Sequence, residues 1–180
     1  MKRDMIGDYL DAFEDEDDED TMQDVYLIFG CDDRDYGLEI KKVTEIVALQ
    51  KITEVPDMPD FVRGVINLRG SVIPVLDVRM RFNMPVVKYH DRTCIIIAKL
   101  ESTTIGLIVD AVREVAKILP DQMEPPPNIS EGTGSRYVRS IGKIGDSVKV
   151  ILNLENFLRE DELQNIEHGL ISKKSDSIAV

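Results

Sequence analysis

An internal repeat constrains the fold of this chain more than any other feature of its sequence. At an offset of 69 residues, the matching segments are Tyr26–Phe29 with Ile95–Ala98, Gly37-Leu38 with Gly106-Leu107, and Val43–Glu45 with Val112–Glu114. Further along the offset is 76, and the matches are Val62-Arg63 with Val138-Arg139, Leu76-Asp77 with Leu152-Asn153, and Phe82 with Leu158. Two constant offsets separated by one seven-residue insertion predict two homologous small units in tandem, packed about a pseudo-two-fold axis.

Short β-branched runs dominate the chain from Val25 onward, and they predict a mainly β protein. The predicted strands are Val25–Phe29, Ile40–Ala48, Val65–Leu68, Val72–Val78, Cys94–Ala98, Ile105–Val109 and Val148–Leu152. Gly, Asp, Asn and Pro separate them at roughly even spacing, which is the pattern of a barrel or sandwich. Because proline cannot donate to a ladder, Pro74 predicts an edge strand or a bulge in its run.

Two short helices are expected beside the strands. Residues 59–63 have a proline near the start and Gly64 at the end, the usual asymmetry of a short helix. Residues 155–168 place apolar side chains near one stripe, and Gly169 can end that helix. The insertion, residues 120–136, contains three consecutive prolines, so we expect a stiff exposed loop that does not join a sheet.

The net charge of −12 is distributed very unevenly along the chain. Residues 1–24 hold eleven acidic and two basic residues, whereas the other 156 residues hold 23 acidic and 20 basic residues. Seven consecutive acids at 14–20 predict a disordered, solvated tail, or a short docking segment ahead of it with apolar residues at helical spacing. A nearly neutral body behind an acidic tail disfavours nucleic acid as a partner.

No stretch of the sequence is apolar for long enough to span a membrane, and no signal segment is evident, so we expect a cytosolic protein. Cys31 and Cys94 are far apart, which favours two free thiols in a reducing compartment. With only two histidines, His90 and His168, the sequence gives no case for a metal site or other cofactor.

The sequence presents no convincing catalytic constellation. Both histidines are expected at the surface, and Asp77 and Asp110, each at a strand end, are expected to accept hydrogen bonds from turn amides. The glycine-rich segment 132–135 lacks the strand-to-helix context of a phosphate-binding loop. We therefore expect no enzyme, although a small β-barrel hydrolase that uses two of the many acids stays open as an alternative.

Two segments suggest function, and they carry a family resemblance. In residues 42–47 a charged Glu45 interrupts an apolar strand, and in residues 64–70 Arg69 lies at a tight turn before Gly70. Taken alone, these are an ordinary solvent-facing glutamate and an ordinary turn arginine. Together with Tyr36–Ile40, Pro59–Gly70 and Ile73–Arg79, however, they make residues 24–165 similar to the CheW-type coupling proteins of bacterial chemotaxis.

This resemblance implies a fold and a task. The fold is two intertwined SH3-like β-barrels with a C-terminal helix, and the task is bridging the cytoplasmic tips of chemoreceptors to the regulatory domain of a CheA-type histidine kinase. The implied location is cytoplasmic, with recruitment to membrane-associated receptor arrays and no insertion into the membrane. A CheW-like scaffold for another receptor–kinase pathway, such as surface motility or development, is the alternative.

The resemblance also implies site residues. Glu45 and Arg69 match the acidic and basic pair near the family's receptor-binding groove, and we expect Val43, Asn67 and Ile73 to line the groove beside that pair. The residues matching the kinase-binding loop are Glu124, Asn128 and Ile129. The loop residues depart from the usual basic, acidic and aromatic pattern, which implies either that the lateral contact is lost or that the partner has changed to suit.

The chain starts at Met1 and contains no kinase or receiver segment, so a stand-alone adaptor is expected. Its predicted parts are a disordered tail over 1–23, a CheW-like domain over 24–170 and a flexible tail over 171–180. Within the domain, barrels are expected at about 24–85 and 90–158, and the helix at about 155–168.

Overall fold

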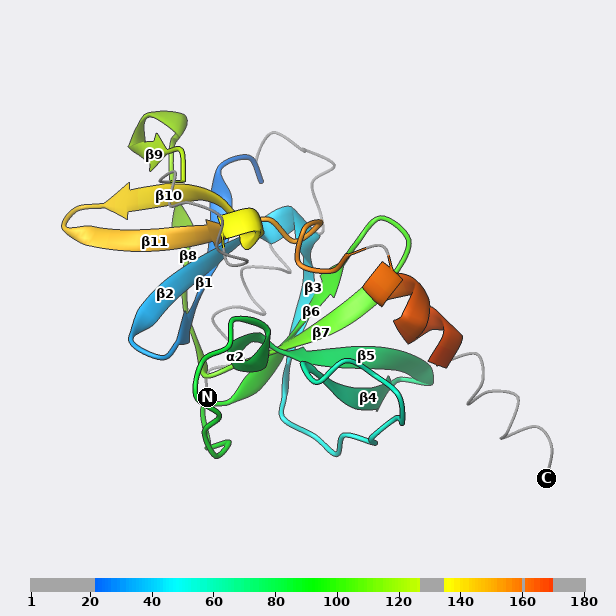
Figure 1. Ribbon diagram of the computed structural model, residues 1–180. Coiled ribbons are helices and arrows are strands. Elements are labelled where there is room, and N and C mark those ends of the chain that lie inside the picture. Colours follow the sequence, from blue (N-terminus) through cyan, green and yellow to red (C-terminus); the bar gives the residue numbers. More distant parts are fainter. Residues whose placement is uncertain (1–21, 127–134, 160, 170–180) are drawn as a thin grey trace, which may run out of the picture.

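A computed structural model describes residues 22–126, 135–159 and 161–169, and it is built from two β-sheets (Figure 1). One sheet has the strand order β8-β1-β2-β11-β10-β9, formed by Ala111–Lys117, Val25–Cys31, Arg34–Glu39, Ser147–Leu152, Val138–Ile144 and Met123–Glu124. The other has the order β3-β6-β7-β5-β4, formed by Val43–Ala48, Cys94–Lys99, Thr104–Val109, Ser71–Asp77 and Val62–Leu68. Short helical elements are η1 (Ile40–Lys42), α2 (Val78–Arg81), η2 (Pro120–Gln122), η3 (Ser135–Tyr137) and a C-terminal helix at 161–169.

Each sheet contains strands from both sequence repeats. In the six-stranded sheet, β1 and β2 of the first repeat pair with β8 and β11 of the second. In the five-stranded sheet, β6 and β7 of the second repeat pair with β3 and β5 of the first. The two repeats therefore exchange strands, which confirms the intertwined arrangement that the family resemblance implied.

Strand registers reproduce the sequence offsets. In β1 and β2, Leu27 lies opposite Leu38, and in β6 and β7 the residues 69 positions later, Ile96 and Leu107, lie opposite each other. The two parallel pairings also correspond. Val75 is opposite Gly106 in one sheet, and its counterpart 76 positions later, Ile151, is opposite Gly37 in the other. Such agreement confirms the repeat and its pseudo-two-fold symmetry.

The glycine shared by the two repeats lies where strands pack most tightly. A Cβ atom added at Gly37 would lie 2.7 Å from Cδ1 of Ile151, and one at Gly106 would lie 2.8 Å from Cγ2 of Ile95. Because protein interiors are close-packed, a methyl group at either position would displace the neighbouring isoleucine. This explains why both repeats carry Gly-Leu at this point.

The main core lies between the two sheets. Apolar side chains from β1, β5, β6 and β7 meet there, among them Leu27, Leu76, Ile96 and Leu107, all fully buried. Aromatic rings extend this core, with Phe82 stacked on Tyr36 at 5.5 Å between ring centres. Each sheet also has a smaller apolar cluster of its own.

Several predicted elements need correction. The strand predicted over Ile40–Ala48 begins at Val43, because Ile40–Lys42 form the 3₁₀ turn η1. Strands β2, β8, β9 and β10 were not predicted, since charged or small residues interrupt their apolar alternation. The stiff loop predicted at 120–136 does join a sheet, because Met123–Glu124 pair with β10.

The helix predicted at Pro59–Arg63 is wrong. Residues 60 and 61 form a turn, in which the Val62 amide donates to the Pro59 carbonyl, and β4 begins at Val62. Gly64 does not end a helix. Its φ of 144° lets the backbone of Thr53 approach, and that residue pairs with Val65.

Proline and the C-terminal helix also differ in detail from expectation. Pro74 lies in an internal strand, with β4 on one side and β7 on the other, although pairing with β7 begins only at Val75. The helix predicted from Glu155 is shorter, because residues 154–158 form turns and bends, and the helix covers 161–169. The predicted tails at 1–23 and 171–180 lie almost wholly outside the described residues, which begin at Met22.

We predict that Gly64→Ala lowers the free energy of unfolding by more than about 2 kcal/mol, because the new Cβ would lie 2.2 Å from the Thr53 carbonyl oxygen at a strained φ. Gly70→Ala is the matched control. Its φ is 87° but nothing lies within 4 Å, so only strain of about 1 kcal/mol is expected. Urea denaturation of both variants measures the difference, and equal losses would contradict the crowding at Gly64.

Candidate docking surface

An ion pair joins the two edge strands of the five-stranded sheet. Glu45 lies on β3 and Arg69 follows β4, the strands at opposite ends of that sheet. The Arg69 guanidinium nonetheless binds the Glu45 carboxylate directly. Thr53 and Val65 exchange two backbone hydrogen bonds of 2.9 Å nearby. The sheet therefore curls until its edges meet, and the predicted Glu–Arg pair lies at that closure.

The turn that carries Arg69 is strained. Arg69 has a φ of 49°, in the left-handed region that glycine adopts most easily, and the corresponding turn of the second repeat has Gly145 at a φ of 58°. The Asn67 side chain accepts a hydrogen bond of 2.9 Å from the Gly70 amide, which fixes the turn. A long side chain at a position that suits glycine motivates a functional hypothesis for Arg69.

The five residues expected at the receptor-binding face divide into two groups. The side chains of Arg69 and Glu45 are 72% and 25% exposed, and Asn67 is exposed beside them. Val43 and Ile73, by contrast, are buried in apolar clusters, so any part they have in docking is to support the surface from below.

Sequence reasoning passed over one exposed apolar side chain at this surface. Val72 lies directly across the hairpin from Asn67 and is 45% exposed. Its counterpart in the second repeat, Val148, is 56% exposed. The sequence did contain a signal for this exposure. Side chains alternate between the two faces of a strand, so Val72, next to the inward-facing Ile73, is expected to point outward.

The predicted kinase-binding residues lie only partly within the described chain. Glu124 belongs to β9, and its carboxylate accepts a 2.5 Å bond from Nζ of Lys143 on β10. Both side chains are about half exposed, at 58% for Glu124 and 51% for Lys143. Asn128 and Ile129 lie outside the described residues, so their roles stay predictions.

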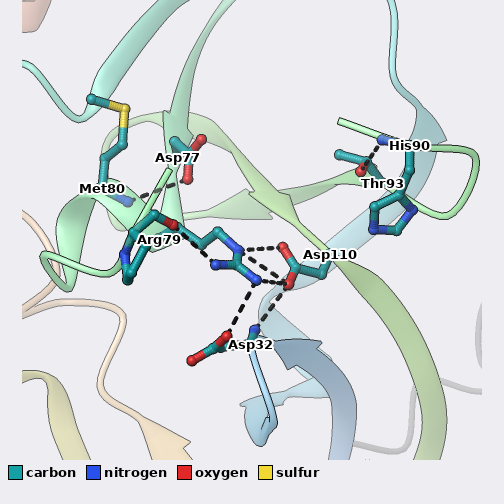
Figure 2. Close-up of polar contacts among 8 residues, drawn as sticks. Asp32, Asp77, Arg79, Met80, His90, Thr93 and Asp110 are labelled. Carbon is teal, nitrogen blue, oxygen red and sulfur yellow. Dashed lines mark hydrogen bonds and ion pairs between the residues drawn. The ribbon is translucent and has the colours of Figure 1, made fainter. Parts of the chain in front are cut away.

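A buried arginine fixes the junction between the two repeats (Figure 2). Arg79 of α2 donates to both carboxylate oxygens of Asp110 after β7, through Nε at 2.8 Å and Nη2 at 2.6 Å. It also donates to the Pro85 carbonyl at 3.0 Å and lies 3.6 Å from the Asp32 carboxylate. One side chain thus links α2, the β1–β2 turn, the end of β7 and the connection between repeats.

Both strand-end aspartates accept backbone amide hydrogens, as predicted. Asp110 accepts from the Asp32 amide at 2.9 Å, and Asp77 accepts from the Met80 amide at 3.3 Å (Figure 2). Asp77 also accepts from the Tyr89 hydroxyl at 2.8 Å. Burial, followed by that hydrogen bond to Asp77, raises the pKa of the Tyr89 hydroxyl.

The described cysteine and histidine side chains do not form a reactive or metal-binding site. Burial raises the pKa of the Cys31 thiol to about 12, which makes it a poor nucleophile. The His90 ring accepts a bond from the Arg92 amide at 3.1 Å, and His168 is exposed on the C-terminal helix. Within residues 22–126, 135–159 and 161–169, no three His, Cys, Asp or Glu side chains gather as metal ligands.

None of the described helices is both long and apolar enough to cross a bilayer.

Comparison with known proteins places the chain in a family. The CheW-like domain model matches residues 25–162. The crystal structure of the scaffolding protein TtCheW from Thermoanaerobacter tengcongensis superposes with a TM-score of 0.71 and 34% identity, covering 77% of this chain and 94% of that one. The chain therefore belongs to the CheW-like family, and it has the family's two-barrel fold.

Curated relatives agree with this assignment. The chemotaxis protein CheW of Klebsiella aerogenes is 29% identical over 149 residues, which cover 83% of this chain and 90% of that protein. The chemotaxis protein CheW of Bacillus subtilis is 34% identical over 128 residues, covering 71% of this chain and 80% of the relative.

We predict that Asp110 contributes stability above its unfolded-state pKa of 3.8 and loses that contribution as the pH falls through its folded value. Burial opposes the charge, but hydrogen bonds from Arg79 and the Asp32 amide outweigh it and lower the pKa of Asp110. Urea denaturation from about pH 7 to about pH 3 should show less pH dependence for Asp110→Asn than for wild type. Asp146→Asn, at an exposed turn, should keep the wild-type dependence, and an unchanged slope in Asp110→Asn would contradict the assignment.

We predict that Arg69→Gly changes the free energy of unfolding by less than about 1 kcal/mol. An exposed ion pair contributes roughly 0–1 kcal/mol, and glycine relieves a left-handed strain of similar size. Thermal and urea denaturation measure this. A loss above about 2 kcal/mol would make Arg69 a structural residue rather than a docking residue.

Proposed function

We propose that this protein is a non-enzymatic adaptor that couples transmembrane chemoreceptors to a CheA-type histidine kinase in chemotaxis. The observation that carries the proposal is the Glu45–Arg69 pair within a CheW-like fold, in which the exposed Arg69 lies on a strained turn and the partly exposed Glu45 lies on β3. An exposed pair of this kind adds little stability. Its charges instead suit the orientation and selection of a partner.

The proposed receptor-binding surface combines this pair with neighbouring polar and apolar groups. Asn67 offers its amide nitrogen beside Arg69, and Val72 offers an exposed apolar contact across the hairpin. A polar rim around a modest apolar contact suits a weak interface. The cytoplasmic tips of the receptors are the expected partners, and assembly in arrays multiplies weak contacts through effective concentration.

The proposed kinase-binding surface lies on the second repeat. Glu124, paired with Lys143 at the edge of the six-stranded sheet, is its described residue, and the regulatory domain of the kinase is its expected partner. The two surfaces belong to different sheets, so one body can hold receptor and kinase at once. The proposed location is the cytoplasm, at receptor arrays.

Calorimetric titration tests this proposal with a receptor-tip fragment and with the kinase regulatory domain. We predict micromolar binding of both partners to the wild-type protein. Arg69→Ala should weaken receptor binding at least about tenfold, since a desolvated charge pair at an interface is worth about 1.4 kcal/mol or more, and it should leave kinase binding unchanged.

Arg139→Ala is the matched control, because Arg139 is also an exposed arginine in an ion pair, with Glu39 of the other sheet. It should leave receptor binding at the wild-type affinity. Binding of neither partner to the wild-type protein would overturn the adaptor function. Equal losses of receptor affinity in Arg69→Ala and Arg139→Ala would show that Arg69 is not specifically part of the receptor-binding site.

A further inference from the structure

The C-terminal helix is held at its start by a buried ion pair. Arg81 of α2 donates to both oxygens of Glu162, through Nη1 at 3.1 Å and Nη2 at 2.9 Å, and its Nε donates to the Phe157 carbonyl at 2.9 Å. Arg81 and Glu162 are each less than 10% exposed. The guanidinium lies 4.1 Å from the ring centre of Phe61 and 4.8 Å from that of Tyr137.

The buried negative charge of Glu162 is compensated by hydrogen-bond donors. Burial opposes the negative charge of Glu162, but the Arg159 amide and then Arg81 donate to it, and together they lower its pKa. Removing one partner of a buried pair leaves the other charge without compensation, which costs far more than the pair contributes. Moving the helix away from Arg81 would leave both buried charges unpaired, so this ion pair fixes the start of the helix.

The far end of the helix packs on the connection between β3 and β4. Ile166 is 1% exposed and belongs to the main core. At Gly169 a Cβ atom would lie 2.4 Å from the methyl carbon of Met58 and 3.7 Å from Val55. Residues 55–58 therefore lie directly against the last turn of the helix, beside the five-stranded sheet (Figure 1).

That connection, residues 49–61, joins the strand of Glu45 to the strand that leads into Arg69. Apart from the turn that leads into β4, its backbone is joined to the described strands only by the bridge between Thr53 and Val65 and by the bond of 2.8 Å that the Asp77 amide of β5 donates to the Phe61 carbonyl. A segment with so few backbone bonds owes its position to what packs on it. The family model ends at residue 162, so most of the helix lies beyond the part of the chain that the model matches.

We propose that the C-terminal helix is a clamp on the β3–β4 connection, and that Arg81 and Glu162 are positioning residues for the Glu45–Arg69 docking surface. By fixing residues 55–58, the helix keeps the Thr53–Val65 bridge closed and the two sheet edges at a constant separation. The surface is then preformed before a partner arrives, which reduces the ordering cost of binding. The effect on receptor binding rests on the proposed function, whereas the clamp itself does not.

Hydrogen exchange and NMR on the full chain test the clamp without any partner. Glu162→Gln and Ile166→Ala should each speed exchange of the Thr53 and Val65 amides by on the order of tenfold and shift the signal of the Met58 methyl group. Gln164→Ala, at an exposed position of the same helix, should do neither. If the helix amides exchange faster but those of Thr53 and Val65 do not, the clamp is wrong.

A restoring variant separates positioning from simple destabilisation. Arg81→Met with Glu162→Leu removes both buried charges and keeps apolar groups that can still pack, but it also removes the bonds to the Phe157 carbonyl and from the Arg159 amide. It should therefore bring the Thr53 and Val65 exchange rates part of the way back from those of Glu162→Gln toward wild-type values. Exchange rates as fast as those of Glu162→Gln, in a double variant that is folded by circular dichroism, would also overturn the clamp.

Receptor-tip binding is the functional readout. Glu162→Gln should weaken it several-fold, by roughly the ordering cost of the connection, and leave the affinity for the kinase regulatory domain unchanged. Equal loss of both affinities would indicate global unfolding and contradict the positioning role. If the wild-type protein binds no receptor tip, the proposed function fails, and the exchange rates alone decide whether the clamp exists.

Discussion

Strands β1 and β8 pair across the two repeats, as do β3 and β6, and neither sheet forms from one repeat alone. This exchange places the main core between the sheets, where both repeats contribute side chains. Each repeat needs the other to cover its apolar faces, so we expect the two to fold as one cooperative unit. The rigidity of the body follows from this arrangement, and an adaptor that holds two partners in a fixed geometry requires such rigidity.

Two buried arginines on the short helix α2 reinforce the exchange. Arg79 binds Asp110 of the second repeat, and Arg81 binds Glu162 near the start of the C-terminal helix. Because the two guanidinium groups have well-placed partners, α2 connects distant parts of the chain with groups that are costly to leave unpaired. The exposed pair, Glu45 with Arg69, differs from these. It closes the edges of one sheet but remains open to solvent, which suits a contact that must be available to a partner.

The repeat made much of the fold predictable from sequence, because matching residues in the two copies occupy matching positions in the sheets. Local patterns failed where a glycine or a charge had a tertiary role. Gly64 resembled a helix end, but its conformation admits the backbone of Thr53 into a bridge. Strand β10 was missed because Arg139, Lys143 and Gly142 obscure its alternation, although β11 and β9 pair with it on either side.

The ion pair of the candidate docking surface was predictable, whereas the exposure of the side chains beside the pair was less so. Glu45 and Arg69 are far apart in sequence, and only the family resemblance brought them together in advance. Val43 and Ile73 were expected beside them, but their strands turn these side chains into the core. Burial depends on how a strand is rotated in its sheet, which the sequence indicates only through alternation. Arg81 and Glu162 were not singled out, because the partners of a buried charge lie in distant segments.

Formation of a ternary complex is the most direct test of the adaptor account. The kinase regulatory domain and a receptor-tip fragment would be mixed with and without this protein, and sedimentation velocity would follow the labelled receptor fragment. The account predicts that the fragment sediments with the kinase domain only when this protein is present, with the mass of a complex of all three. Mutually exclusive binding, in which the kinase domain displaces the receptor fragment from this protein, would contradict it.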